Sequence, residues 1–180
     1  MFSKTNLLSA ALAVGYLAVG TSAGAGAYVN GCVWYATKPI TPFNVTFQVP
    51  TSVVHCMYDK GTNAQAVVTT DGLTCASVGH VSGKSSSSGG DTCATDDSRW
   101  GISYTAGSKS GTTYSTWSAP IFKSDHIDLY DQSPGTNICG SAAKCDASSI
   151  KIGSSGNDNV WIIFDPAASS KADVKDSEEL

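Results

Sequence analysis

Apolar and polar residues alternate along much of this chain, and the alternation predicts short β-strands. The clearest case is residues 43–49, in which Phe43, Val45, Phe47 and Val49 are separated by polar residues. Alternation with a period of two places one face of a strand in a core and the other face in water. Prolines stand directly before and after this segment, which agrees with a strand that ends there.

Eight more segments have a strand-like pattern, and residues typical of turns separate them. Of these, 52–58 and 64–69 are expected to pair as a hairpin across the Gly-containing turn 59–63. The continuous apolar run 160–164 is typical of a central strand covered on both faces. We therefore predict an all-β fold, a disulfide-stapled antiparallel β-sandwich or barrel of about nine short strands. The predicted strands are 28–35, 43–49, 52–58, 64–69, 100–104, 112–117, 125–130, 148–152 and 159–164.

Residues 1–27 have the layout of a secretory signal peptide. Lys4 gives a basic start, residues 7–19 are apolar and uncharged, and residues 25–27 fit the small-x-small pattern that signal peptidase accepts. The apolar run is too short to span a bilayer. We expect a secreted, extracellular protein without a membrane span.

Removal of this leader leaves residues 28–166 as a single β-rich domain, large enough to bury its own core. Residues 167–180 are mostly small or charged and are expected to form a disordered acidic tail. The mature chain is expected to be a monomer.

The composition supports a β-rich body and argues against nucleic-acid binding. Glutamate occurs only at Glu178 and Glu179, so the body lacks a residue that commonly fills exposed helix faces. The formal net charge is −4, and Arg99 is the only arginine. Binding to phosphates needs clustered lysine and arginine, and no such cluster is present.

The six cysteines predict three structural disulfides, because the predicted compartment is oxidising. Their spacing and the lack of a nearby histidine argue against a zinc site, and neither a metal nor another cofactor is expected. The expected pairs are Cys139–Cys145, which closes a small loop between two strands, Cys56–Cys75 and Cys32–Cys93.

Two of the three histidines stand beside residues that suggest a role for them. His126 follows Asp125 and lies close to Asp128, and a histidine beside carboxylates is suited to general acid–base catalysis. The simpler interpretation is that His126 enters a strand and points to solvent. His55 precedes Cys56 and is interpreted as the neighbour of a disulfide.

The tryptophans are candidates for stacking on a saccharide, because flat aromatic faces beside Asp and Asn are typical of lectin sites. We expect Trp34 and Trp161 to lie in the core. Trp100 and Trp117 have more polar neighbours and are the better surface candidates. The predicted ligand-binding residues are therefore Trp100, Trp117, His126 and Asp128.

Asn44 begins an Asn-Val-Thr acceptor for N-glycosylation on the polar face of the strand at 43–49. A glycan fits there without disturbing the buried face. This predicts a eukaryotic secreted glycoprotein.

The general layout resembles the small cysteine-containing proteins that fungi secrete toward hosts or competitors. Within that group, the strand at 43–49 leading to Cys56, and the late pair Cys139 and Cys145, resemble the fungal major-allergen and elicitor β-barrel family. The resemblance covers about half of the mature chain, and no site residue follows from it.

Three functions remain open. The first is a secreted, non-enzymatic interaction protein, an effector, elicitor or toxin with a role in virulence, whose partner is a surface protein or glycan of a host or competitor. The second is a lectin-like protein that binds cell-wall carbohydrate. The third is a secreted hydrolase that uses Asp and His126.

Overall fold

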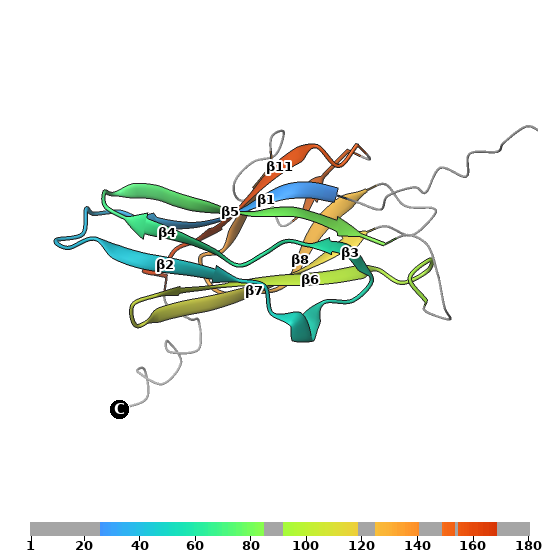
Figure 1. Ribbon diagram of the computed structural model, residues 1–180, viewed down its shortest axis with the longest axis horizontal. Helices are drawn as coiled ribbons and strands as arrows, with labels where there is room; N and C mark the ends of the chain where they lie inside the picture. The colour runs from blue at the N-terminus through green and yellow to red at the C-terminus, as the bar shows by residue number, and fades with distance from the viewer. Residues whose placement is uncertain (1–25, 85–91, 119–124, 141–148, 154, 169–180) are drawn as a thin grey trace, which may run out of the picture.

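Two β-sheets stacked on one another make up the described part of the chain (Figure 1). The computed structural model describes residues 26–84, 92–118, 125–140, 149–153 and 155–168. These residues form eleven strands and one short 3₁₀ turn, η1 (Thr51–Val53). The predicted all-β, disulfide-stapled fold is confirmed, with two more strands than the sequence suggested.

The five-stranded sheet has its two chain-terminal strands side by side in its middle. Its order is β3-β5-β1-β11-β9. The strands β1 and β11 pair in parallel, and the other pairs are antiparallel. The bounds are β1 (Gly26–Tyr35), β3 (Met57–Lys60), β5 (Gly72–Gly83), β9 (Asn137–Gly140) and β11 (Asp158–Phe164).

The six-stranded sheet is antiparallel throughout and has the order β10-β8-β7-β6-β2-β4. Its long strands β6 and β7 form a hairpin at the centre of the sheet. The bounds are β2 (Phe43–Gln48), β4 (Ala64–Val68), β6 (Ser98–Ala106), β7 (Lys109–Ser118), β8 (His126–Gln132) and β10 (Ser149–Lys151).

The predicted hairpin of 52–58 with 64–69 is wrong, because β3 and β4 belong to different sheets. β3 pairs with β5, whereas β4 pairs with β2. The connection crosses between the layers at Gly61, which has a φ of +68°. The next residue, Thr62, donates its backbone N–H to the oxygen of Val78 at 2.7 Å, so β5 holds this crossing in place.

The strand β5 was missed by the sequence analysis. A register shift opposite Val29 and Asn30 interrupts its alternation, and Gly79 beside it has a φ of +90°. Such a bulge requires an extra residue, and a glycine adopts this backbone without strain. The strand therefore pairs along its whole length, but the bulge makes its sequence pattern irregular.

The core lies between the two sheets and contains Trp100 and Trp117, each 0% exposed. Their rings meet edge to face, with centroids 6.1 Å apart. Each indole N–H has a partner, the Lys60 oxygen at 2.8 Å and the Ser115 hydroxyl at 2.9 Å respectively. Buried tryptophan is stable where its N–H is satisfied in this way.

The expected positions of the tryptophans are thus largely reversed. Trp100 and Trp117 occupy inward positions of β6 and β7, and their polar neighbours alternate outward. Trp34 is 44% exposed and Trp161 is half-buried, because each follows a residue that faces the core, Val33 on β1 and Val160 on β11. The inward positions of β1 are taken by residues no larger than valine. Among these, Gly31 is required, since a Cβ there would lie 2.6 Å from the Phe47 ring.

Two of the expected disulfide pairs are also wrong. The described bonds are Cys32–Cys75 and Cys56–Cys93, not Cys56–Cys75 and Cys32–Cys93. Cys32 stands directly opposite Cys75 in the pairing of β1 with the unforeseen strand β5, with a Cα–Cα distance of 4.1 Å.

Cys139 is disulfide-bonded as well. Cys145 lies outside the described residues, so the pair Cys139–Cys145 stays a prediction. Across the described ranges, no helix has the length and apolarity needed to cross a membrane.

The position of β1 limits where a leader could be removed without loss of strand residues. Gly26 and Ala27 are buried strand residues, paired with Ser82 and Val81 of β5. A cut after Ala27 would delete both, whereas a cut after Ala25 would leave the strand whole. Residues 23–25 fit the small-x-small pattern as well as residues 25–27 do.

A leader whose removal leaves β1 whole ends at Ala25, so we predict a mature start at Gly26, to be measured by intact mass and N-terminal sequencing of material from the medium. A variant begun at Tyr28 should lose about 1–2 kcal/mol of unfolding free energy, through the lost pairing and the lost burial of Ala27. A natural start at Tyr28, with a protein as stable as one begun at Gly26, would contradict this.

Candidate functional site

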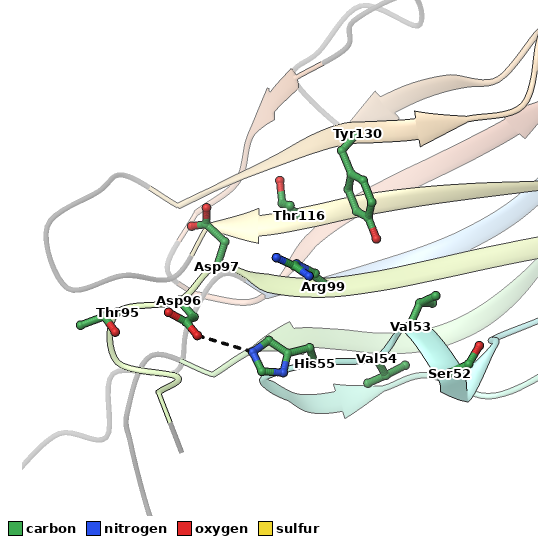
Figure 2. Close-up of a pocket in the computed structure, with 10 residues that line it drawn as sticks. All are labelled: Ser52, Val53, Val54, His55, Thr95, Asp96, Asp97, Arg99, Thr116 and Tyr130. Atoms are coloured by element: carbon green, nitrogen blue, oxygen red, sulfur yellow. Dashed lines mark ion pairs between the residues drawn. The ribbon is translucent and has the colours of Figure 1, made fainter. Parts of the chain in front are cut away.

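An open cleft of about 830 Å³ lies on the outer face of the six-stranded sheet, between that sheet and the segment that precedes β3 (Figure 2). Polar side chains dominate its lining. The ten lining residues are Ser52, Val53, Val54, His55, Thr95, Asp96, Asp97, Arg99, Thr116 and Tyr130.

The floor of the cleft consists of outward side chains from β6, β7 and β8. Arg99 stands directly opposite Thr116. Tyr130 falls at a register shift between β7 and β8, and its ring stacks on that of Tyr114 at 5.8 Å and 24°. Bulges commonly re-aim a side chain, and here Tyr130 points toward the opening that Arg99 also enters (Figure 2).

His55 forms one wall, and two backbone hydrogen bonds hold it against β6. Its N–H donates to the Arg99 oxygen at 3.0 Å, and the Arg99 N–H donates to the His55 oxygen at 2.9 Å. This isolated bridge attaches the segment after η1 to the floor. The sheet therefore holds the backbone of His55, which places the imidazole at this wall of the cleft.

Cys56, the next residue, turns the chain away from the cleft and into β3. It is buried and has a φ of +52°, a left-handed backbone that costs a non-glycine residue about 1–2 kcal/mol. Two donors hold its carbonyl oxygen, the Ser98 hydroxyl at 2.6 Å and the Lys84 N–H at 2.7 Å. Strained residues of this kind cluster at functional sites.

The opposite wall is the turn at 92–97. A disulfide between Cys93 in this turn and Cys56 joins the two walls. The backbone N–H of Asp96 donates to the Thr92 oxygen at 3.0 Å, and the Thr92 hydroxyl donates to the Asp96 carboxylate. The Asp96 carboxylate lies 3.8 Å from the Nε2 of His55, so the two walls meet across the cleft (Figure 2).

The cleft presents groups of both charge signs. Arg99 supplies a guanidinium, and Asp96 and Asp97 supply carboxylates. His55 and Asp96 are both about half exposed, so water screens their attraction. Burial raises the pKa of Tyr130, an effect that the charge of Arg99 partly offsets. The Tyr130 hydroxyl therefore keeps its proton at neutral pH and can donate a hydrogen bond.

The structure brings two of the predicted ligand-binding residues together beside the cleft and buries the other two. The Nε2 of His126 lies 2.9 Å from the carboxylate of Asp128. Asp128 stands opposite Thr116, which lines the cleft, but neither His126 nor Asp128 lines it. Trp100 and Trp117 are in the core and cannot contact a ligand there.

The sequence analysis missed the cleft residues His55, Asp96, Arg99 and Tyr130. In the sequence, His55 and Asp96 each lie close to a cysteine. This closeness indicates a shared site only when the correct disulfide pairing is known. Asn44 is exposed on β2, which leaves its predicted glycosylation sterically open and untested. Within the described ranges, no group of three or more potential metal ligands comes together.

Comparisons with known proteins give this cleft no precedent. No family model matches the chain, and neither a curated protein sequence nor a solved structure is significantly similar to it. The resemblance to the fungal major-allergen family therefore stays a prediction. The role of the cleft has to be argued from its own geometry.

The two described disulfides permit a matched test of how the cleft is built. They span 37 and 43 residues, so loss of either should cost a similar amount of stability, about 3–4 kcal/mol. We expect only the double variant Cys56→Ala/Cys93→Ala to raise hydrogen exchange at 54–56 and 95–97 and to move the NMR signals of the His55 ring. Cys32→Ala/Cys75→Ala is the control. Equal local effects in the two variants would show that the cleft does not depend on the nearer bond.

Proposed function

We propose that this chain is a secreted, non-enzymatic interaction protein of the effector or elicitor type, which binds a surface protein of a host or competitor through the cleft. Export has support from the disulfides, which form and persist in oxidising compartments. The observation that carries the proposal is the polar cleft with Tyr130 and Arg99 at its floor and walls joined by the Cys56–Cys93 disulfide.

Tyrosine and arginine are among the residues that contribute most to protein–protein binding. The Tyr130 ring is 48% exposed and is supported by Tyr114, so little side-chain entropy is lost when a partner covers it. A site with carboxylates on one wall and a guanidinium on the floor suits a surface that carries the opposite arrangement of charges. These features favour a protein partner for this site.

The hydrolase alternative has less support. It relied on His126, and His126 contacts Asp128 outside the cleft. A general base has to reach the proton that it removes from a bound substrate. The pair His126 and Asp128 lies on an outer sheet face beside the cleft instead.

The test is retention of labelled protein on intact cells or tissue of the natural surroundings. Tyr130→Ala and Arg99→Ala should each weaken retention by about ten-fold or more, the effect of losing an interface hot spot. Val67→Ala is the control, since Val67 is 52% exposed on β4, which is at one edge of the sheet and does not line the cleft.

Protease treatment of the cells should remove the binding, whereas treatment with glycosidases should leave it. Full retention of both cleft variants, with an unchanged fold by near-UV circular dichroism, would overturn the proposal.

A further inference from the structure

A second exposed surface lies on the outer face of the five-stranded sheet, away from the cleft. On β1, Tyr28 and Trp34 are 47% and 44% exposed. Trp34 stands directly opposite Leu73 of β5, which is 48% exposed. Side chains that are opposite in a ladder share a face of the sheet, so Trp34 and Leu73 form one apolar contact area.

The neighbouring strand β11 extends this area. Trp161 is in register with Asn30, and Ile163 is in register with Cys32, an outward position of β1. Both are half-buried, whereas Val160 and Ile162 between them face the core. We call the group Tyr28, Trp34, Leu73, Trp161 and Ile163 the aromatic face.

The aromatic face is long and firmly supported. Tyr28 and Trp34 are six residues apart on one strand, which corresponds to roughly 20 Å along the sheet. β1 and β11 are interior strands, each paired on both sides. Figure 1 shows β1 between β5 and β11. The Cys32–Cys75 bond ties β1 to β5 between the aromatic positions, so the rings sit on a backbone that cannot easily deform.

The face carries almost no charge, although the chain has a net charge of −4. Between the rings, the outward positions are held by Asn30, Ser77 and the disulfide. Among the described residues, titratable side chains lie at the two ends of the face: at one end His80 stands opposite Tyr28 and donates a hydrogen bond to the Asp59 carboxylate at 2.7 Å, and at the other end the exposed Asp71 directly precedes β5. A surface of this composition has no electrostatic preference for an ionic partner.

We propose that the aromatic face binds a neutral, extended polysaccharide by stacking its aromatic rings on the sugar rings. The flat apolar faces of sugar rings match exposed tryptophan and tyrosine, which bury a large area with few rotatable bonds. The amide of Asn30 offers both donors and an acceptor for sugar hydroxyls. A polymer suits the face because the rings follow the strands in a row instead of surrounding a pocket.

This inference does not rest on the proposed function, because the two surfaces lie on different sheets. The cleft carries charges and suits a protein, whereas the middle of the aromatic face, between Tyr28 and Trp34, is uncharged. Binding to a wall polymer would hold the protein where a partner for the cleft is displayed.

The experiment is a depletion assay with the exported protein and three insoluble neutral polymers, cellulose, chitin and curdlan. We expect binding to at least one polymer, and we expect it to persist in 1 M NaCl, since salt screens only charge–charge attraction. Trp34→Ala should weaken binding by about ten-fold, and Trp34→Phe should retain most of it because the ring face remains.

Tyr130→Ala and Arg99→Ala are the controls and should bind the polymer as the wild type does, whatever they do on cells. Thermal unfolding of each variant checks that the fold is kept. Three results would overturn the proposal: no binding to any of the polymers, equal binding by Trp34→Ala, or a wild-type dimer in ultracentrifugation that Trp34→Ala dissociates. The last would show that the face joins two copies of the chain.

Discussion

The covalent bond between Cys56 and Cys93 is the constraint on which the cleft depends. It joins two segments that belong to no strand, the residue after His55 and a residue within the turn 92–97 that carries Asp96. Without it, the left-handed backbone of Cys56 would have little to oppose its strain beyond the hydrogen bonds to its carbonyl oxygen. The bond thus fixes the distance between the two segments that form the walls of the cleft.

The rest of the fold supports these walls through strand pairing and the packing of the core. Apolar residues of both sheets form one core cluster between the layers, and each tryptophan of the pair in the middle has its indole N–H satisfied. Gly31 of one layer leaves the space that the Phe47 ring of the other layer occupies. This packed interior supports both sheets, and the two candidate binding surfaces are their outer faces.

The sequence predicted the fold class well because alternation was clear in segments such as 43–49. It failed where alternation was broken, as at the bulge in β5, and this failure led directly to the wrong disulfide pairs. Once β5 is known, Cys32 and Cys75 are direct neighbours, and Cys56 is left for Cys93. Disulfide connectivity depends on strand pairing, which local patterns do not show.

The candidate surfaces were harder to predict, for a related reason. Polar neighbours suggested that Trp100 and Trp117 were exposed, but in a strand the neighbours of a buried residue point the other way. For the same reason Trp34 was expected inside. Which face of a strand is buried depends on what packs against it, and a single segment of sequence does not contain that information.

The parallel pairing of β1 with β11 has a consequence for how the protein is made. The first strand of the domain has its place between β5 and the last strand, with Ala27 opposite Asp158. The central ladder of that sheet therefore cannot close until Asp158–Phe164 has been synthesised, and contacts of such long sequence separation form slowly. While the residues between the two strands are being made, β1 has to wait without its parallel neighbour.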